Sequence, residues 1–314
     1  MIKLKKLSVS SLAALSALLT VMIPGTAHAG TIGGALTNVA NSFVTSPLLI
    51  SSFSYIAGLV LVTWSLFTFR DHVDGGSGAP PLSAGVKRML SGGMFLALPT
   101  VAQAAIQTWV GGGMAGMTFT ATATPAGGSA TSLDEMAVAF ISDMAGPISV
   151  VISSFAYLGG LLLIVMAISR LTRSYQEGWR GPTGFGTIMT LLCGGALLSS
   201  GGMMGAFSTS IFGDATSFTN PVLSGVISGA MSAAEQAKVV ATLQALITFV
   251  VIVGWIAFIR GWFVLKAVAD GNSQVSMAQA LTFLFGGALA VNIGEVVNLL
   301  QNTVGGAVLG ISFT

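Results

Sequence analysis

Few side chains in this chain of 314 residues could take part in chemistry, and they are scattered. Cys193 is the only cysteine, and its apolar neighbours predict a small buried residue with an unreactive thiol. His72 is the only histidine beyond residue 29, too little for a histidine-based metal site. The sequence carries no phosphate-binding loop, His-Glu-x-x-His or Gly-x-Ser-x-Gly motif. It therefore predicts a protein that is not an enzyme and needs no metal or cofactor.

Glu295 is the ionisable residue that could line a polar path. It lies in an apolar stretch, where a carboxylate is costly and normally faces other helices or water, and Asn292 and Asn298 flank it at helical spacing. The alternative is that the apolar stretch ends near Ile293, which would place Glu295 at the outer surface of the membrane. The sequence leaves both readings open.

The composition predicts an integral membrane protein. Hydrophobic residues make up 53% of the chain and charged residues only 7%, and the mean hydropathy is +0.87. A soluble domain does not reach these figures, so the lipid bilayer is the first expected partner. The formal net charge of +2 is small and dispersed, which argues against direct binding of nucleic acid.

The first 29 residues have the pattern of a signal peptide. Lysines at positions 3, 5 and 6 precede an apolar run over 7–23, and Ala27-His28-Ala29 is typical of a cleavage site. Cleavage would start the mature chain on the periplasmic side of a bacterial inner membrane. The alternative, an uncleaved anchor helix, is disfavoured by the helix-breaking pair Pro24-Gly25.

Six apolar stretches are long enough to cross a bilayer, at 48–69, 89–109, 148–169, 185–207, 239–261 and 277–299. Six crossings from a periplasmic start leave both termini in the periplasm. Eight Lys and Arg side chains then fall on the cytoplasmic side and only Lys238 falls outside, as the positive-inside rule requires. Six of the eight are expected to form contacts in the cytoplasmic loops: Arg70, Lys87, Arg88, Arg170, Arg173 and Arg180.

The sequence repeats itself. Residues 51–59, Ser-Ser-Phe-Ser-Tyr-Ile-Ala-Gly-Leu, recur as 153–161, Ser-Ser-Phe-Ala-Tyr-Leu-Gly-Gly-Leu, 102 residues later. This predicts an all-α integral membrane fold of three pseudo-repeated helical hairpins. The predicted divisions are the signal peptide 1–29, a first hairpin over 30–110, a flexible periplasmic linker over 111–132, a second hairpin over 133–213 and a third over 214–314.

Glycine is expected to hold the hairpins together, because helices in lipid associate through close backbone approach rather than through a hydrophobic force. The predicted packing glycines are Gly58, Gly92, Gly93, Gly160, Gly194, Gly195, Gly286 and Gly287. Short amphipathic helices are also expected on the periplasmic side before each hairpin, most clearly over 133–144 and more weakly over 31–44 and 222–237. Each would close the bundle at the membrane surface or, alternatively, dock a periplasmic partner.

The first hairpin resembles a known family. Tyr55-Ile56-Ala57-Gly58, the run from Phe67 to His72, Pro80-Pro81-Leu82-Ser83-Ala84-Gly85-Val86-Lys87-Arg88, Gly92-Gly93 and Leu98-Pro99 are similar to the IcmC/DotE family. Its members are small inner-membrane proteins of type IVB secretion systems, both Dot/Icm and IncI-type conjugative, and are related to the conjugal transfer proteins TraQ and TraR. Members carry one such unit, whereas this chain carries three and a signal peptide.

The resemblance implies a structural or channel component of a type IVB secretion or conjugal transfer apparatus, with no catalytic residues. Its expected partners are other membrane proteins of the apparatus and further copies of itself. The alternative is a stand-alone transporter or channel for a small solute. A transporter would need facing polar pairs near mid-membrane, and the centres of the six stretches hold almost none. An intramembrane enzyme, the third alternative, would need convergent catalytic groups, and none is visible.

Overall fold

The computed structural model describes residues 31–44, 46–75, 80–110, 132–171, 185–213, 223–225, 232–304 and 312–313. The predicted signal peptide and nearly all of the predicted linker lie outside this part of the chain. The described residues are almost entirely helical. The exception is a short antiparallel ribbon in which β1 (Leu223–Gly225) pairs with β2 (Ser312–Phe313).

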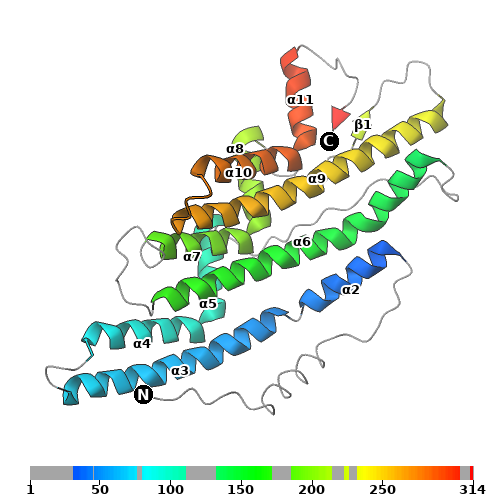
Figure 1. The fold of residues 1–314 in the computed structure, drawn as a ribbon. Coiled ribbons are helices and arrows are strands. Elements are labelled where there is room, and N and C mark those ends of the chain that lie inside the picture. The colour runs from blue at the N-terminus through cyan, green and yellow to red at the C-terminus, as the bar shows by residue number, and fades with distance from the viewer. Residues whose placement is uncertain are drawn as a thin grey trace.

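Three long helices organise the molecule: α3 (Ser46–Asp74), α6 (Leu133–Leu171) and α9 (Ala233–Ala269). They run side by side in the same direction, and the shorter α2 (Ile32–Val44) continues the line of α3 and packs against α6 (Figure 1). Each long helix is followed by a shorter antiparallel helix that bends sharply into another. These bent pairs are α4 (Leu82–Leu96) with α5 (Leu98–Val110), α7 (Phe185–Leu198) with α8 (Ser200–Phe212), and α10 (Met277–Val291) with α11 (Ile293–Val304).

The helices have the length and composition of a membrane protein. Within the described residues, three stretches are long and apolar enough to cross a bilayer, and they contain α3, α6 and α9. The number of crossings rises to six if each bent pair counts as one. About 20 apolar residues suffice for one crossing. The outer faces of the helices are also apolar: Phe53, Ile56 and Trp64 of α3 are each between half and two-thirds exposed. The fold is therefore all-α with membrane-spanning character.

The second arm of each predicted hairpin differs from a straight crossing. The bends are 84° between α4 and α5, 86° between α7 and α8, and 80° between α10 and α11. They fall at Ala97, Ser199 and Asn292, and the local causes differ. Pro99 cannot donate a backbone hydrogen bond next to the first bend, whereas at the third the Asn292 side-chain amide donates to Ala288 O at 2.8 Å and competes with the helix.

The short periplasmic helices predicted from the sequence also differ in part from the helices of the structure. Residues 31–44 form a helix of their own, α2, but residues 133–144 are the first turns of α6, which continues through Pro147 for 39 residues. Likewise, the end of the 222–237 segment is the beginning of α9. Its N-terminus is fixed by a capping box, in which Glu235 N donates to Ser232 Oγ and Ser232 N donates to Glu235 Oε2.

The core lies between neighbouring helix pairs. The larger cluster joins α6, α7, α9 and α10, and at its centre Phe258 meets Trp255 and Trp262 edge to face, both with ring centroids 6.1 Å apart. A second cluster joins α4 and α5 to α6 and α7 through Leu98, Ile106 and similar side chains. The three helix pairs therefore form a row, in which the middle pair contacts both others.

Glycines lie where each long helix crosses its shorter partner. A Cβ on Gly58 of α3 would stand 2.8 Å from Gly92 O of α4, and one on Gly160 of α6 would stand 2.7 Å from Gly194 O of α7. The third crossing is the same, because a Cβ on Gly254 of α9 would stand 3.0 Å from Gly287 O of α10. Each crossing thus brings two backbones closer than any side chain permits.

The remaining predicted packing glycines behave differently from one another. A Cβ on Gly195 would stand 2.7 Å from Ala105 O, so this residue sets the approach of α5 to α7. At Gly93 and Gly286, in contrast, a Cβ would meet nothing within 4 Å among the described residues. These two glycines therefore do not pack helices together within the described part of the chain.

Replacing Gly160 by alanine is expected to destabilise the protein by about 1–3 kcal/mol, because the new methyl group must push α7 away from α6. Gly93→Ala is the matched control: its Cβ points into open space, and alanine favours a helix over glycine by up to about 1 kcal/mol. Thermal unfolding in detergent, followed by intrinsic fluorescence, would compare the two. Equal unfolding temperatures for both variants would contradict the close-contact role of Gly160.

Candidate functional sites

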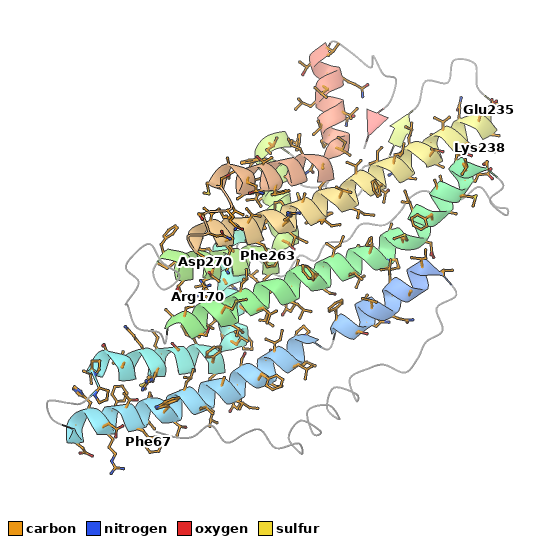
Figure 2. The ribbon with its side chains drawn as sticks, viewed as in Figure 1. Phe67, Arg170, Glu235, Lys238, Phe263 and Asp270 are labelled. Atoms are coloured by element: carbon orange, nitrogen blue, oxygen red, sulfur yellow. The ribbon has the colours of Figure 1, made fainter. Side chains whose placement is uncertain are left out.

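A cluster of charges joins the ends of α6 and α9 at the side of the predicted cytoplasmic turns. The two guanidinium nitrogens of Arg170 donate to the two carboxylate oxygens of Asp270 at 2.6 and 3.0 Å, and Lys266 Nζ lies 2.6 Å from Asp270 Oδ2. Figure 2 shows Arg170 and Asp270 meeting from the two helix ends. Arg170 also donates to Thr190 Oγ1 of α7 at 3.1 Å. The cluster therefore ties the second helix pair to the third.

The charges of this cluster shift the titration of Asp270. Partial burial on its own raises the pKa of Asp270, but hydrogen bonds from Arg170 and Lys266, together with their positive charges, outweigh it. The pKa of Asp270 therefore lies below the usual value of 3.8. The carboxylate stays ionised at neutral pH and acts as a fixed link between the helices.

The first helix pair carries a related contact. Arg88 of α4 donates to Thr68 Oγ1 of α3 at 2.6 Å, and its guanidinium lies 5.0 Å from the ring centroid of Trp64. Thr68 and Arg88 stand 102 residues before Arg170 and Thr190, which make the same kind of bond in the second pair. In the first pair the arginine lies on the shorter helix and the threonine on the long one, and in the second pair the positions are reversed.

The opposite ends of the long helices are also linked. The carboxylate of Asp143 in α6 accepts the backbone N–H of Gly33 at 2.8 Å, at the start of α2, where negative charge is favoured. Lys238 of α9 lies 2.9 Å from Glu135 Oε1 of α6. The amphipathic first turns of α6 therefore hold α2 on one side and α9 on the other.

Glu295 lies in the first turn of α11 and is half-buried. With Phe212, Asn298, Leu299, Asn302 and Thr303 it lines a groove of about 370 Å³ whose surface is partly polar and partly apolar. Asn298 thus shares its surface, as the helical spacing predicts. Asn292 does not: it is buried at the bend, and its Nδ2 points to Ala288 O. The structure therefore gives Glu295 a polar surface but brings no other ionisable group beside it among the described residues.

The predicted cytoplasmic-loop residues lie mostly within helices. Arg70 is near the end of α3 and pairs with Asp74 at 3.3 Å on the exposed surface, and Lys87 and Arg88 belong to α4. Arg170 ends α6, as described above, while Arg173 and Arg180 lie outside the described residues.

The remaining side chains singled out from the sequence, His72 and Cys193, make structural contacts or are buried. His72 shares a hydrogen bond of 2.8 Å between its Nδ1 and Pro80 O, across the first turn, and Cys193 is buried in α7. The described part of the chain contains no group of three or more His, Cys, Asp or Glu side chains that could hold a metal ion.

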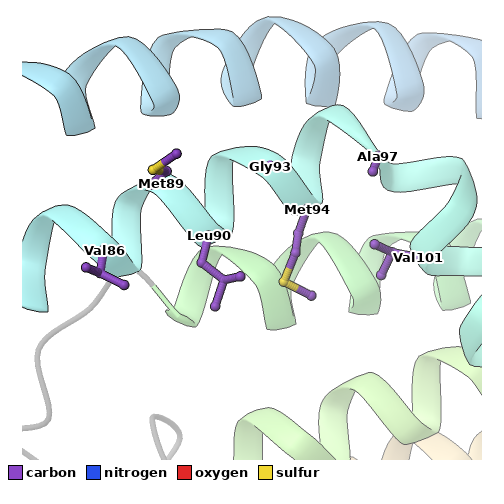
Figure 3. Close-up of a pocket in the computed structure, with 7 residues that line it drawn as sticks. All are labelled: Val86, Met89, Leu90, Gly93, Met94, Ala97 and Val101. Atoms are coloured by element: carbon purple, nitrogen blue, oxygen red, sulfur yellow. The ribbon is translucent and has the colours of Figure 1, made fainter.

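An open apolar groove of about 550 Å³ lies along α4 (Figure 3). Its lining residues all come from α4, the bend and α5: Val86, Met89, Leu90, Gly93, Met94, Ala97 and Val101. Sequence reasoning missed this groove, since it treats Gly93 as a packing residue. A glycine, which has no side chain, between larger apolar residues is nevertheless a usable signal for a surface hollow. Asp270 was missed too. Its spacing of four residues from Lys266 is a usable signal for an ion pair.

Comparison with known proteins gave no match: no family model, no curated protein and no solved structure is similar to this chain.

Replacing Asp270 by asparagine is expected to destabilise the protein by about 2 kcal/mol, because Arg170 and Lys266 lose a shared, mostly buried partner. Since the pKa of Asp270 is lowered in the folded state, the difference from wild type should be full above about pH 5 and disappear as the pH falls through that lowered pKa. Thermal unfolding in detergent over a pH series measures both effects.

Asp74→Asn is the control for this measurement. Asp74 also accepts from an arginine, but both side chains are about two-thirds exposed or more, so its loss should cost less than about 0.5 kcal/mol. The role given to Asp270 is contradicted if the two variants unfold at the same temperature at neutral pH.

Proposed function

We propose that this protein is a non-catalytic structural or channel subunit of a type IVB secretion or conjugal transfer apparatus in a bacterial inner membrane. The observation that carries the proposal is the glycine crossing, which recurs in three helix pairs and suits a protein built to pack helices. The described residues include no group of three or more His, Cys, Asp or Glu side chains that could hold a metal ion. The resemblance of 51–99 to the IcmC/DotE family is the reason for proposing this kind of apparatus.

The three helix pairs are proposed to be copies of one unit. Gly58, Gly160 and Gly254 cross Gly92, Gly194 and Gly287 in the same way, and the bend follows five residues after the second glycine every time. The Arg–Thr bond that joins each of the first two pairs, with its residues 102 positions apart, supports the same conclusion. Three like units in one chain suit a scaffold in which each presents similar surfaces to its neighbours.

The proposed topology places the turn of each unit in the cytoplasm and both termini of the mature chain, after removal of residues 1–29, in the periplasm. Arg70, Lys87, Arg88, Arg170 and Lys266 lie close to these turns, which supports this orientation. The partners are then the lipid bilayer, other membrane proteins of the apparatus and further copies of the chain. Substrate DNA is not bound directly, because the chain offers no basic stripe.

One observation favours the alternative of a solute transporter or channel. Glu295, Asn298, Asn302 and Thr303 form a polar groove on one face of α11, and polar surfaces in membrane helices often belong to a transport path. The groove is lined by α11 and by Phe212 at the end of α8, however, and its lining among the described residues includes apolar Leu299 and no second ionisable group. It therefore gives the transporter less support than the repeated crossings give the scaffold.

Two experiments on cells that carry the apparatus test the proposal. Mild-detergent extraction of a tagged chain should recover it together with other secretion proteins, and deletion of its gene should abolish transfer of substrate while a plasmid copy restores it. The scaffold should also tolerate Glu295→Gln without loss of transfer, because no role in the assembly depends on that charge. A monodisperse lone protein that moves a small solute into liposomes, with a flux that Glu295→Gln abolishes, would contradict the proposal and favour the transporter.

A further inference from the structure

The helices that follow the bends cover the next helix pair in the row. Ala105 of α5 packs against Gly195 of α7, and Leu98, Ala102 and Ile106 complete this contact. One unit further along, α8 takes the place of α5. Phe207, 102 residues after Ala105, meets Phe285 of α10 edge to face with ring centroids 5.7 Å apart. The helix after each of the first two bends thus contacts the shorter helix of the next pair, closely where α5 meets Gly195 and through one aromatic pair where α8 meets α10.

Among the described residues, no helix covers the corresponding surface of the first unit. Gly93 stands 102 residues before Gly195, which Ala105 contacts, and a Cβ on Gly93 would meet nothing within 4 Å among the described residues. Gly93 lies in the middle of the apolar groove on α4 (Figure 3). Val86, Met89 and Leu90 in this groove are each slightly more than half exposed. The groove is therefore the unoccupied counterpart of the surface on which α5 lies in the second unit.

The matching element at the other end of the row is α11, the third of the helices that follow a bend. Within the described residues, no further helix pair packs against it. Leu300 stands 93 residues after Phe207, the same spacing that separates Gly194 from Gly287. Leu299, Leu300 and Val304 of α11 are 50%, 56% and 70% exposed. Within the described part of the chain, an apolar helix face thus lies open at one end of the row and an apolar groove at the other.

We propose that the groove around Gly93 on α4 receives α11 of a second copy of this chain, with Leu300 of that copy against Gly93. The inference rests on the three-unit repeat of the proposed function and extends it from one chain to the next. Such a contact joins two different surfaces, so it is heterologous and builds a ring or an open row rather than a closed two-fold dimer. Repetition of the contact within the chain favours this occupant over an acyl chain of a lipid.

Cysteine cross-linking tests the contact. Gly93→Cys and Leu300→Cys are placed in separate, differently tagged chains in a Cys193→Ser background and expressed together in a host that lacks the secretion apparatus. Oxidation of the membranes should give a covalent dimer that contains both tags, and both cysteines in one chain should give a ladder of higher oligomers. Gly286→Cys with Leu300→Cys is the matched control, because Gly286 is also open but lies on another surface. A mixed dimer no stronger than in this control would overturn the proposal.

Filling the groove gives a second, independent readout. In purified full-length protein, Gly93→Trp should shift the assembly to monomer by light scattering without lowering the unfolding temperature, since open space surrounds position 93. Gly286→Trp should leave the assembly unchanged. An oligomer that persists in Gly93→Trp, or a monomeric wild type with a phospholipid held in the groove, would overturn the inference. If the cross-link forms but deletion of the gene leaves transfer of substrate intact, the proposed function is refuted and the contact between copies still stands.

Discussion

The structure depends on backbone contact between helices in a solvent that does not drive them together. Lipid tails are as apolar as the side chains they surround, so helices associate by close packing. At Gly58, Gly160 and Gly254 the backbone of one helix meets the carbonyl of its partner, at a distance that any side chain would prevent. Each long helix thereby acquires a fixed companion, and the position of the bend, of the turn and of the next unit follows from that crossing.

Polar contacts act at the ends of the helices, where the bilayer gives way to water. Arg170, Asp270 and Lys266 join the second and third helix pairs at one end. At the other end, Asp143 binds the start of α2, and Glu135 with Lys238 joins α6 to α9. The middle of the molecule relies on glycine and aromatic packing instead. This division places charges where they are least costly and leaves the central surfaces free for lipid or for other chains.

The sequence predicted the helical class, the apolar stretches and the glycines of the crossings, because hydropathy and local repetition are visible along a single chain. It did not predict the bends, since Ala97, Ser199 and Asn292 lie inside apolar stretches and a hydropathy window does not register a change of direction. The ion pair of Asp270 with Arg170 was not predicted for another reason. The two residues lie 100 positions apart, and only the folded row brings them together. The sequence analysis likewise did not predict that α6 continues through Pro147.

The central claim is that the three helix pairs are like-oriented units in one membrane, so their turns must lie on the same side. Single cysteines at Gly75, Ser174 and Asn272, one in each turn, can be introduced into a Cys193→Ser background and exposed to a membrane-impermeant maleimide. Inverted inner-membrane vesicles should allow labelling at all three positions, and intact spheroplasts at none. Labelling of even one of the three turns from the periplasmic side would contradict the account.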